Sequence, residues 1–524
     1  MSTTAVPAPP PVRKRRPDPS VSQAATVGSV AFVISVALSF VITPFIIRTL
    51  GDARYGTWSL IAQVTGYYGL LDFGVRGAVA YYAASLLAKD EDEDVSRLAS
   101  SAFWGLSVIA IGALIFGGVL MVYFPSWFET AGVESGEIRG ALAIVTISLA
   151  LTLPFDVFSA IVNGCRRPDI VSGLDVALRI GKSIVMVIAL MNGGGLVALA
   201  AIALGGKIVM WIVLAAVSRR YVPSLRLRPG LFQREWLRKV LSYGSRNFVI
   251  NISLAVIHRL DYVLIGTFLG VRFVTFYSIG KMMTGYVSKA CSNVTRAFTM
   301  HFAHHAARNE TDRLRELFLT GARISGLFAM LLTGYVLAFG TPFVRLWLGP
   351  QYVEGPWKER TDVVLAILLL GQAPRLFQSI SWQLLFGTRR VNFLMWLQVG
   401  EAIANLALSL ALVKPLGLPG VALGTFFPLL VTNTYFLPRY VLRQLELPKS
   451  EYFNRGIGRP LLVALVTTAI SAALVWFVPI GGWVSFAALA AVATVIGAVL
   501  SYFGVLTAEE RVWVRNKIPG LRPS

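Results

Sequence analysis

The chain has few of the features that enzymes use for chemistry. It contains no Walker A sequence, and it lacks the HExxH, CxxC and GxSxG motifs of metalloproteases, redox proteins and serine hydrolases. Its two cysteines, Cys165 and Cys291, are too few for a disulfide framework and are interpreted as packing residues. A built-in ATPase is therefore excluded, and we expect a protein that is not an enzyme and needs no cofactor.

Charge is also scarce. Charged residues make up 14% of the sequence and hydrophobic residues 55%, whereas soluble domains carry about 25% charge. Apolar runs of at least about 18 residues recur along the whole chain, each long enough to cross a hydrocarbon core of ~30 Å. The sequence therefore predicts an all-α polytopic membrane protein.

The apolar runs predict about 14 transmembrane helices, which we divide into two lobes of six and a final pair. Their expected bounds are 24–47, 57–86, 98–124, 138–163, 170–192, 195–217, 241–268, 273–302, 319–345, 362–386, 391–413, 417–441, 457–478 and 482–506.

Acidic residues are outnumbered by basic ones, 27 to 48, so that the net charge is +21. Such an excess suggests nucleic acid in a soluble protein, but here the basic residues follow the predicted topology, and we expect no nucleic-acid partner. With the N-terminus inside, cytoplasmic segments hold 29 Lys and Arg residues and external loops hold 8. This positive-inside asymmetry predicts that both termini are cytoplasmic.

The two predicted lobes repeat short sequences in the same order. LGDARYGTWS at Leu50 matches LGVRFVTFYS at Leu269, and both are followed by TGY at the same distance. GCRR and LVAL in the first half match GTRR and GVAL in the second, and all four matches have offsets of 219 to 224 residues. An even number of helices per repeat gives lobes of one orientation, related by an axis along the membrane normal.

These observations predict the following segments: a disordered basic cytoplasmic tail (1–22), a first lobe (23–218), a basic cytoplasmic linker (219–240), a second lobe (241–443), two further helices (444–506) and a cytoplasmic tail (507–524).

Ionisable residues inside the spans are the most informative feature, because each costs about 2.5–3.5 kcal/mol or more and usually faces a cavity or a partner. Eleven cations fall within or at the ends of predicted spans: Arg76, Arg179, Lys182, Lys207, Arg246, Arg259, Lys281, Lys289, Arg296, Arg323 and Arg375. Only five acids accompany them: Asp72, Asp156, Asp175, Asp261 and Glu401. We expect local pairs at i, i+4 between Asp72 and Arg76 and between Asp175 and Arg179, and one basic stripe through Lys281, Lys289 and Arg296.

The cations deepest in the spans are Arg76, Arg179, Lys182, Lys207, Lys289 and Arg375, and the sequence suggests that acids do not balance them. Unpaired cations at this depth would bind an anion, and a pyrophosphate headgroup accepts several charge-assisted hydrogen bonds. Structural clips and snorkelling side chains are the alternative explanation.

Histidines offer a weaker signal. His301, His304 and His305 have a spacing that could hold a metal, but they lie at a predicted helix end beside Arg308, and we expect no metal site there. His258, beside Arg259, could titrate or could be a packing residue.

The first two predicted spans, ITPFIIRTLGDARYGTWSLIAQVTGYYGLLDFGVRGAVAYYAA, resemble the N-terminal signature of the polysaccharide transporter family, the O-antigen and exopolysaccharide flippases of the multidrug/oligosaccharidyl-lipid/polysaccharide exporter superfamily. The matching residues are Pro44, Arg48, Leu50–Gly51, Tyr55–Gly56 and Leu71–Asp72–Phe73–Gly74. RLDYVLIGTFLGVRFVTFYSIGKMM is similar to that family's seventh and eighth helices.

The resemblance implies a V-shaped, MATE-like pair of six-helix bundles with two peripheral helices in the bacterial inner membrane. It implies translocation of undecaprenyl-pyrophosphate-linked oligosaccharides to the periplasmic face, coupled to H⁺ or Na⁺. Candidate coupling residues are the five acids named above, and candidate partners are a polysaccharide polymerase and co-polymerase. The alternatives are a lipid II flippase, a MATE-type cationic drug exporter, which would need an acidic cavity, and a membrane-embedded glycosyltransferase, which would need a large extramembrane loop.

Overall fold

The computed structural model describes residues 21–67, 74–128, 130, 132–508 and 510–512, and this part of the chain is helical with no strand. The first half contains six long elements: α1 (Val21–Gly66), α2 (Val75–Ala88), α3 (Asp92–Trp127), α4 (Ser135–Gly164), α5 (Pro168–Met191) and α6 (Leu196–Tyr221).

The second half begins with two helices of similar length and continues with shorter, interrupted ones. They are α7 (Arg234–Phe268), α8 (Val271–Ala307), α9 (Thr311–Leu348), α10 (Thr361–Phe377), α11 (Ser379–Gly387), α12 (Val391–Leu416), α13 (Leu418–Val431), α14 (Leu437–Gln444), α15 (Lys449–Glu451), α16 (Gly458–Phe477) and α17 (Trp483–Gly504). Two π-helical turns, η5 (Thr432–Phe436) and η6 (Tyr452–Ile457), interrupt the last part of this half.

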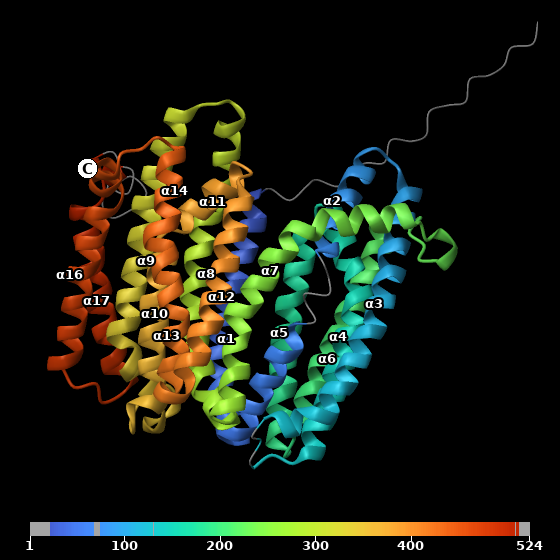
Figure 1. The fold of residues 1–524 in the computed structure, drawn as a ribbon, viewed down its shortest axis with the longest axis horizontal. Coiled ribbons are helices and arrows are strands. Elements are labelled where there is room, and N and C mark those ends of the chain that lie inside the picture. The colour runs from blue at the N-terminus through green and yellow to red at the C-terminus, as the bar shows by residue number, and fades with distance from the viewer. Residues whose placement is uncertain (1–20, 68–73, 129, 131, 509, 513–524) are drawn as a thin grey trace, which may run out of the picture.

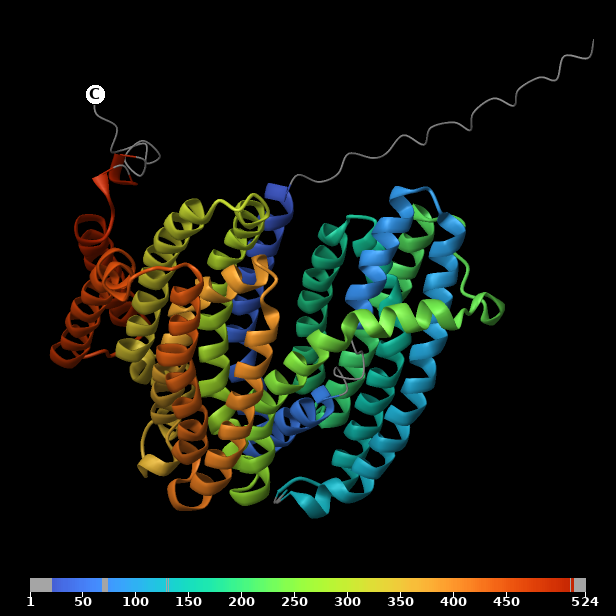
Figure 2. The same ribbon diagram turned by 45° about the horizontal axis from the view of Figure 1, so that its top comes forward.

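The helices form two groups that converge at one end and diverge toward the other (Figures 1 and 2). Helices α2 to α6 pack on one another in the first group, and α8 to α14 pack together in the second. Helices α1 and α7 contact both groups, while α16 and α17 pack against α9 on the outer side. The all-helical, polytopic prediction is thereby confirmed.

Not every predicted span is apolar along its whole length. Among the described residues, nine helices are long and apolar enough to cross a membrane, or ten if α10 and α11, which meet at 41°, form one broken span. Helices α5, α7 and α8 do not pass this test, although they are long and lie within the bundles. They carry most of the ionisable residues that the sequence places inside spans, which explains their lower hydropathy.

The repeat predicted from sequence has a counterpart in the backbone. Gly51 and Gly270, which are 219 residues apart, both join two helices with positive φ angles of 78° and 98°. Asp90 and Asn309, also 219 apart, have φ angles of 60° and 55°. The GCRR and GTRR sequences both place their first arginine at a φ of 58°, which is uncommon for a residue with a long side chain. Equivalent turns at equivalent positions support a duplicated unit.

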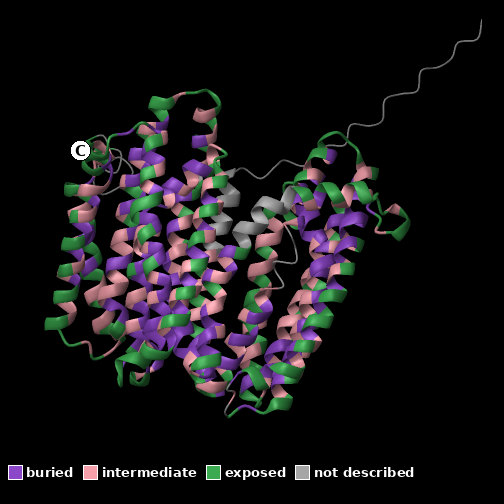
Figure 3. Cartoon of the chain, viewed as in Figure 1, coloured by how far each residue is buried: buried purple, intermediate pink, exposed green. Residues whose placement is uncertain are grey.

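The outer surface is suited to lipid. Buried residues lie between helices within each group, and exposed ones lie on the outward faces (Figure 3). On α3 most of the exposed side chains are apolar, among them Val108, Ile111, Ile115 and Phe116. A helix that is apolar on its buried and its exposed faces is typical of a multi-pass membrane protein.

The basic linker between α6 and α7 is fixed to the first group. Three serines on one face of α3 bind its backbone: Ser96 and Ser100 donate to the carbonyls of residues 224 and 226, and Ser101 accepts the amide of Gln233 at 2.8 Å. Trp236, in the first turn of α7, then packs edge-on against Tyr82 of α2. The start of α7 is therefore held by the first group, although the rest of the helix packs against α12.

Candidate functional site

Helix α5 is unusually open for a helix of the first group. Among its residues only Leu190 is buried, and its polar face bears Asp175, Arg179 and Lys182. The guanidinium of Arg179 contacts the carboxylate of Asp175 at 3.1 Å, which confirms the predicted i, i+4 pair. Both side chains remain nearly half exposed (45% and 48%), so the pair is accessible to a ligand.

The polar face of α5 continues onto α6, where Lys207 lies near Lys182 of α5. The aliphatic stem of Lys182 lies against Gly206, where a Cβ atom would approach its Cδ to 2.4 Å. The absence of a side chain at Gly206 therefore makes room for the lysine between the two helices. The ammonium of Lys182 is within electrostatic range of Asp175, Arg179 and Lys207. Three cations and one carboxylate thus share a small region, which we call the α5–α6 cationic cluster.

This cluster faces the other group of helices. Arg179 is within electrostatic range of Tyr286 on α8, and the Tyr286 ring contacts that of Phe40 on α1, with 5.5 Å between ring centroids. The cluster therefore lies on the side of the first group that faces α1 and α8.

Arg76 is placed differently from the sequence-based expectation. Its guanidinium contacts the carboxylate of Asp156 on α4 at 2.9 Å. The predicted local partner, Asp72, lies outside the described residues. An acid 80 positions away in the chain reaches Arg76 because α2 and α4 pack side by side.

The two lysines of the basic stripe predicted along α8 have different surroundings. Lys289 is exposed, and within the described residues it forms no ion pair. Lys281 is instead turned toward α7, where its Nζ lies 2.9 Å from a carboxylate oxygen of Asp261. Of the stripe's members, Lys281 is therefore neutralised by a buried acid on the neighbouring helix, and Lys289 is not.

The Asp261–Lys281 pair lies in a buried polar network. The Asp261 side chain is fully buried, and the same oxygen that contacts Lys281 accepts hydrogen bonds from the hydroxyls of Tyr277 and Thr425. The Thr425 hydroxyl in turn accepts a hydrogen bond from Asn405 at 2.9 Å. The second oxygen of Asp261 and the amide oxygen of Asn405 are both buried and have no hydrogen-bond partner among the described residues. Buried acceptors of this kind are unfavourable unless a proton, water or cation satisfies them.

A second buried acid, Glu401 of α12, is surrounded in a similar way. It accepts hydrogen bonds from Thr432 and Asn433 of the π-helical turn η5, and Arg375 contacts its other oxygen at 3.4 Å. The Arg375 guanidinium also lies over the Trp382 ring, 5.1 Å from its centroid. Arg375 is therefore held on two sides and is only 21% exposed.

The six candidate anion-binding cations thus separate into two sets. Arg76, Arg179 and Arg375 are each paired with a carboxylate, so the expectation that acids do not balance them is wrong for these three. Lys182, Lys207 and Lys289 form no ion pair within the described part of the chain. Arg179, Lys182 and Lys207 come together in the α5–α6 cationic cluster, and Arg375 lies near His258 and Lys281 in the second group.

Contacts near Gly51 fix α1 to the second group at one end. The Tyr352 hydroxyl bonds the carboxylate of Asp52, and the Thr275 hydroxyl donates to its backbone carbonyl at 2.6 Å. Gly56 allows close packing there, because a Cβ atom would lie 1.9 Å from the carbonyl oxygen of Val271. These contacts lie beside Gly51, where a kink with non-helical backbone angles interrupts α1.

Sequence reasoning missed the uncharged members of the buried networks. Tyr277, Thr425 and Asn433 are common residues, and nothing in their local sequence distinguishes them from packing residues. One signal was available: Asn405 follows Glu401 by four positions and so occupies the same face of α12.

The three histidines at the end of α8 form no metal centre in the described residues. His305 is bonded through Nδ1 to the carboxylate of Glu310 at 2.6 Å, a partner that the sequence did not suggest. This hydrogen bond lowers the pKa of Glu310. The pair joins the end of α8 to the start of α9, a role in helix connection.

Comparison with known proteins agrees with this architecture. Residues 45–355 match the model of a family described as polysaccharide biosynthesis proteins. Two curated relatives are each 22% identical. One is the uncharacterized membrane protein EpsK of Bacillus subtilis, and the match covers 93% of this chain and 96% of that protein. The other is a putative O-antigen transporter of Shigella flexneri, and the match covers 72% of this chain and 88% of that protein.

Solved structures share the fold at low identity. The lipid II flippase MurJ in an inward closed conformation has a TM-score of 0.70 and 12% identity, covering 92% of this chain and 98% of that one. An inward-facing MATE-family multidrug resistance transporter of the MOP superfamily has a TM-score of 0.61 and 14% identity, with 82% and 96% covered. The chain is a multi-pass membrane protein and belongs to the polysaccharide biosynthesis protein family.

Proposed function

We propose that this protein is a flippase that moves undecaprenyl-pyrophosphate-linked oligosaccharide units across the inner membrane for surface polysaccharide biosynthesis. The observation that carries the proposal is the α5–α6 cationic cluster, in which one carboxylate accompanies three cations inside the bundle. The protein's family membership supports the same substrate class, as does the name of the O-antigen transporter among its relatives.

The cluster fits a pyrophosphate in charge and in donor chemistry. Arg179 offers a planar pair of N–H donors that matches two phosphoryl oxygens, and Lys182 and Lys207 add ammonium donors. Asp175 holds Arg179 in place without burying it. We propose that Arg76, Lys289 and Arg375 bind the same headgroup, or the sugars next to it, at other stages of transport.

The transport step is proposed to be a rocking motion of the lobes 23–218 and 241–443 around this site. In the structure the groups are joined at the end that holds Asp52 and Tyr352, so the opposite end would admit substrate. Of the candidate acids, Asp261 and Glu401 are best suited to couple H⁺ or Na⁺, because they are buried and belong to polar networks. Asp156 and Asp175 are less buried, with 14% and 48% of their side chains exposed.

The fold similarity to MurJ does not by itself favour lipid II, because that carrier presents the same pyrophosphate and the identity is only 12%. A cationic drug exporter is disfavoured because the cluster would repel a cationic drug.

Deleting the gene should separate these possibilities. We expect the deletion strain to lose surface polysaccharide and to accumulate lipid-linked repeat units on the cytoplasmic leaflet, with normal growth on cationic dyes. The measurement is a headgroup-resolved analysis of extracted carrier lipids, together with dye sensitivity. Normal polysaccharide combined with dye sensitivity would overturn the proposal in favour of drug export.

A further inference from the structure

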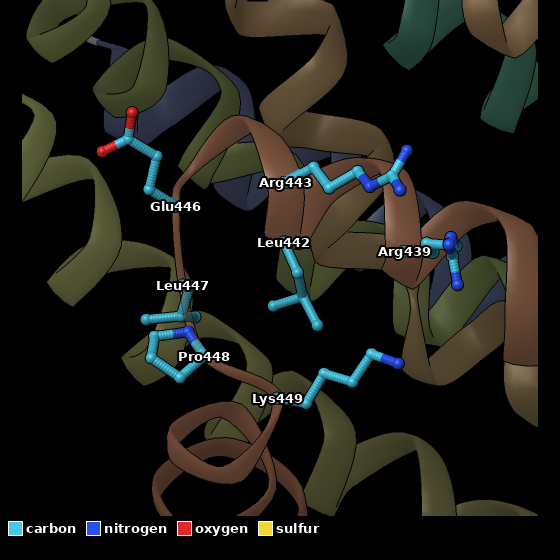
Figure 4. A pocket seen from close by; sticks show the side chains of 7 residues that line it. All are labelled: Arg439, Leu442, Arg443, Glu446, Leu447, Pro448 and Lys449. Atoms are coloured by element: carbon cyan, nitrogen blue, oxygen red, sulfur yellow. The ribbon is translucent and has the colours of Figure 1, made fainter.

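A second basic site lies far from the α5–α6 cationic cluster, at the end of the second group where α16 begins (Figures 1 and 4). It is a pocket of about 490 Å³ between α14 and α15, which we call the α14 pocket. Its lining residues are Arg439, Leu442, Arg443, Glu446, Leu447, Pro448 and Lys449.

The cations of the α14 pocket are not neutralised. Arg439 and Arg443 are four residues apart on α14 and therefore share a face, and Lys449 follows after a short turn. Within the described residues, none of the three forms an ion pair, and the Arg439 guanidinium lies over the Tyr435 ring, 5.7 Å from its centroid. In Figure 4, Arg439, Arg443 and Lys449 extend to one side of the pocket.

The single acid of the pocket is occupied elsewhere. The carboxylate of Glu446 binds the guanidinium of Arg315 on α9 at 3.0 Å, and Figure 4 shows it pointing away from the three cations. Arg315 also donates to the carbonyl of Leu445, which fixes the turn between α14 and α15. The pocket therefore presents three positive charges to a ligand and no free carboxylate.

The rest of the pocket is apolar and lies beside a lipid-facing surface. Leu442 and Leu447 are buried and form its floor. Tyr435, Phe436 and Phe453 lie in the adjacent π-helical turns and are each about half exposed (54%, 49% and 53%). Exposed aromatic rings next to cations are typical of the boundary between headgroups and acyl chains. Local π-helical turns often occur at functional sites.

We propose that the α14 pocket binds the phosphate headgroup of an anionic phospholipid in the leaflet at this end of the bundle. The three cations would bind the phosphate, the buried leucines would contact the glycerol region, and the exposed aromatic residues would border the acyl chains. This inference is independent of the transported substrate, since the pocket lies on the outer part of the second group and shares no residue with the cluster between the groups.

The test is binding of phosphatidylglycerol to the purified full-length protein, measured by native mass spectrometry in a neutral detergent. Wild-type protein should retain phosphatidylglycerol and not phosphatidylcholine. The variant Arg439→Gln/Arg443→Gln/Lys449→Gln should bind it on the order of 100-fold more weakly, since each cation near a membrane surface contributes about five-fold. If the triple variant does not fold, the single variant Arg443→Gln replaces it in the test. It should bind phosphatidylglycerol about five-fold more weakly than the wild type.

The matched control is Arg219→Gln/Arg220→Gln/Arg234→Gln, which removes three exposed cations near the α6–α7 linker. It should bind like the wild type. Equal retention of the two lipids by wild-type protein, equal losses in both triple variants, or competition by millimolar inorganic phosphate as effective as phosphatidylglycerol would each overturn the proposal.

Discussion

Replacing Arg179 and Lys182 together by glutamine should lower export of lipid-linked oligosaccharide by at least about 100-fold. Each charge-assisted hydrogen bond to a phosphoryl oxygen contributes about 1.5–3 kcal/mol, and two would be lost at once. The double variant leaves one cation, Lys207, and one carboxylate, Asp175, so the cluster would have no excess of positive charge. Export can be measured as surface polysaccharide per cell at equal amounts of protein in the membrane.

Two controls distinguish binding from a general effect of charge. Arg308→Gln/Arg313→Gln removes two cations that are 63% and 71% exposed at the junction of α8 and α9, and export should be unchanged. Lys182→Arg keeps the charge and should retain most of the activity. Full export by the Arg179→Gln/Lys182→Gln variant would exclude the cluster as the headgroup site.

Breaking the buried pair between α7 and α8 should have the largest effect on stability. Lys281→Met leaves Asp261 buried beside Tyr277 and Thr425 without its cation. Removing one member of a buried ion pair typically costs about 3–5 kcal/mol in the free energy of unfolding. The double variant Asp261→Asn/Lys281→Met should recover much of this loss, because no buried charge then remains.

The measurement is thermal unfolding of the purified variants in one detergent, arranged as a double-mutant cycle. Arg455→Gln is a suitable control, since it breaks a largely exposed pair between Arg455 on η6 and Glu451 on α15 and should cost less than about 0.5 kcal/mol. If Lys281→Met unfolded at the same temperature as this control, the Asp261–Lys281 pair would not contribute to stability. If the double variant were stable but inactive in export, Asp261 and Lys281 would be assigned to coupling.

The sequence predicted those features that depend on composition and local spacing. Apolar runs predicted the helical membrane fold, and the i, i+4 spacing predicted the contact between Asp175 and Arg179. The short matches around Gly51 and Gly270 predicted the repeat, which the structure supports with equivalent positive φ angles.

Pairing across helices could not be predicted in the same way. Arg375 and Glu401 are 26 positions apart, and Arg76 and Asp156 are 80 apart, so both contacts depend on how the helices pack. Lys281 shares a face of α8 with Lys289 by spacing alone, yet Asp261 holds only the former. The hydroxyl and amide groups around the two buried acids were missed because Thr, Tyr and Asn carry no charge that would stand out in an apolar segment.

The proposed role of the α5–α6 cationic cluster is to bind a pyrophosphate headgroup during translocation. The most direct measurement uses purified protein in liposomes with fluorescent undecaprenyl-pyrophosphate-linked and undecaprenyl-monophosphate-linked oligosaccharides. We predict that the wild-type protein moves the pyrophosphate carrier faster than the monophosphate carrier, and that the Arg179→Gln/Lys182→Gln variant moves neither above the rate of protein-free liposomes. Equal rates for the two carriers in wild-type protein, unchanged in the variant, would contradict the claim.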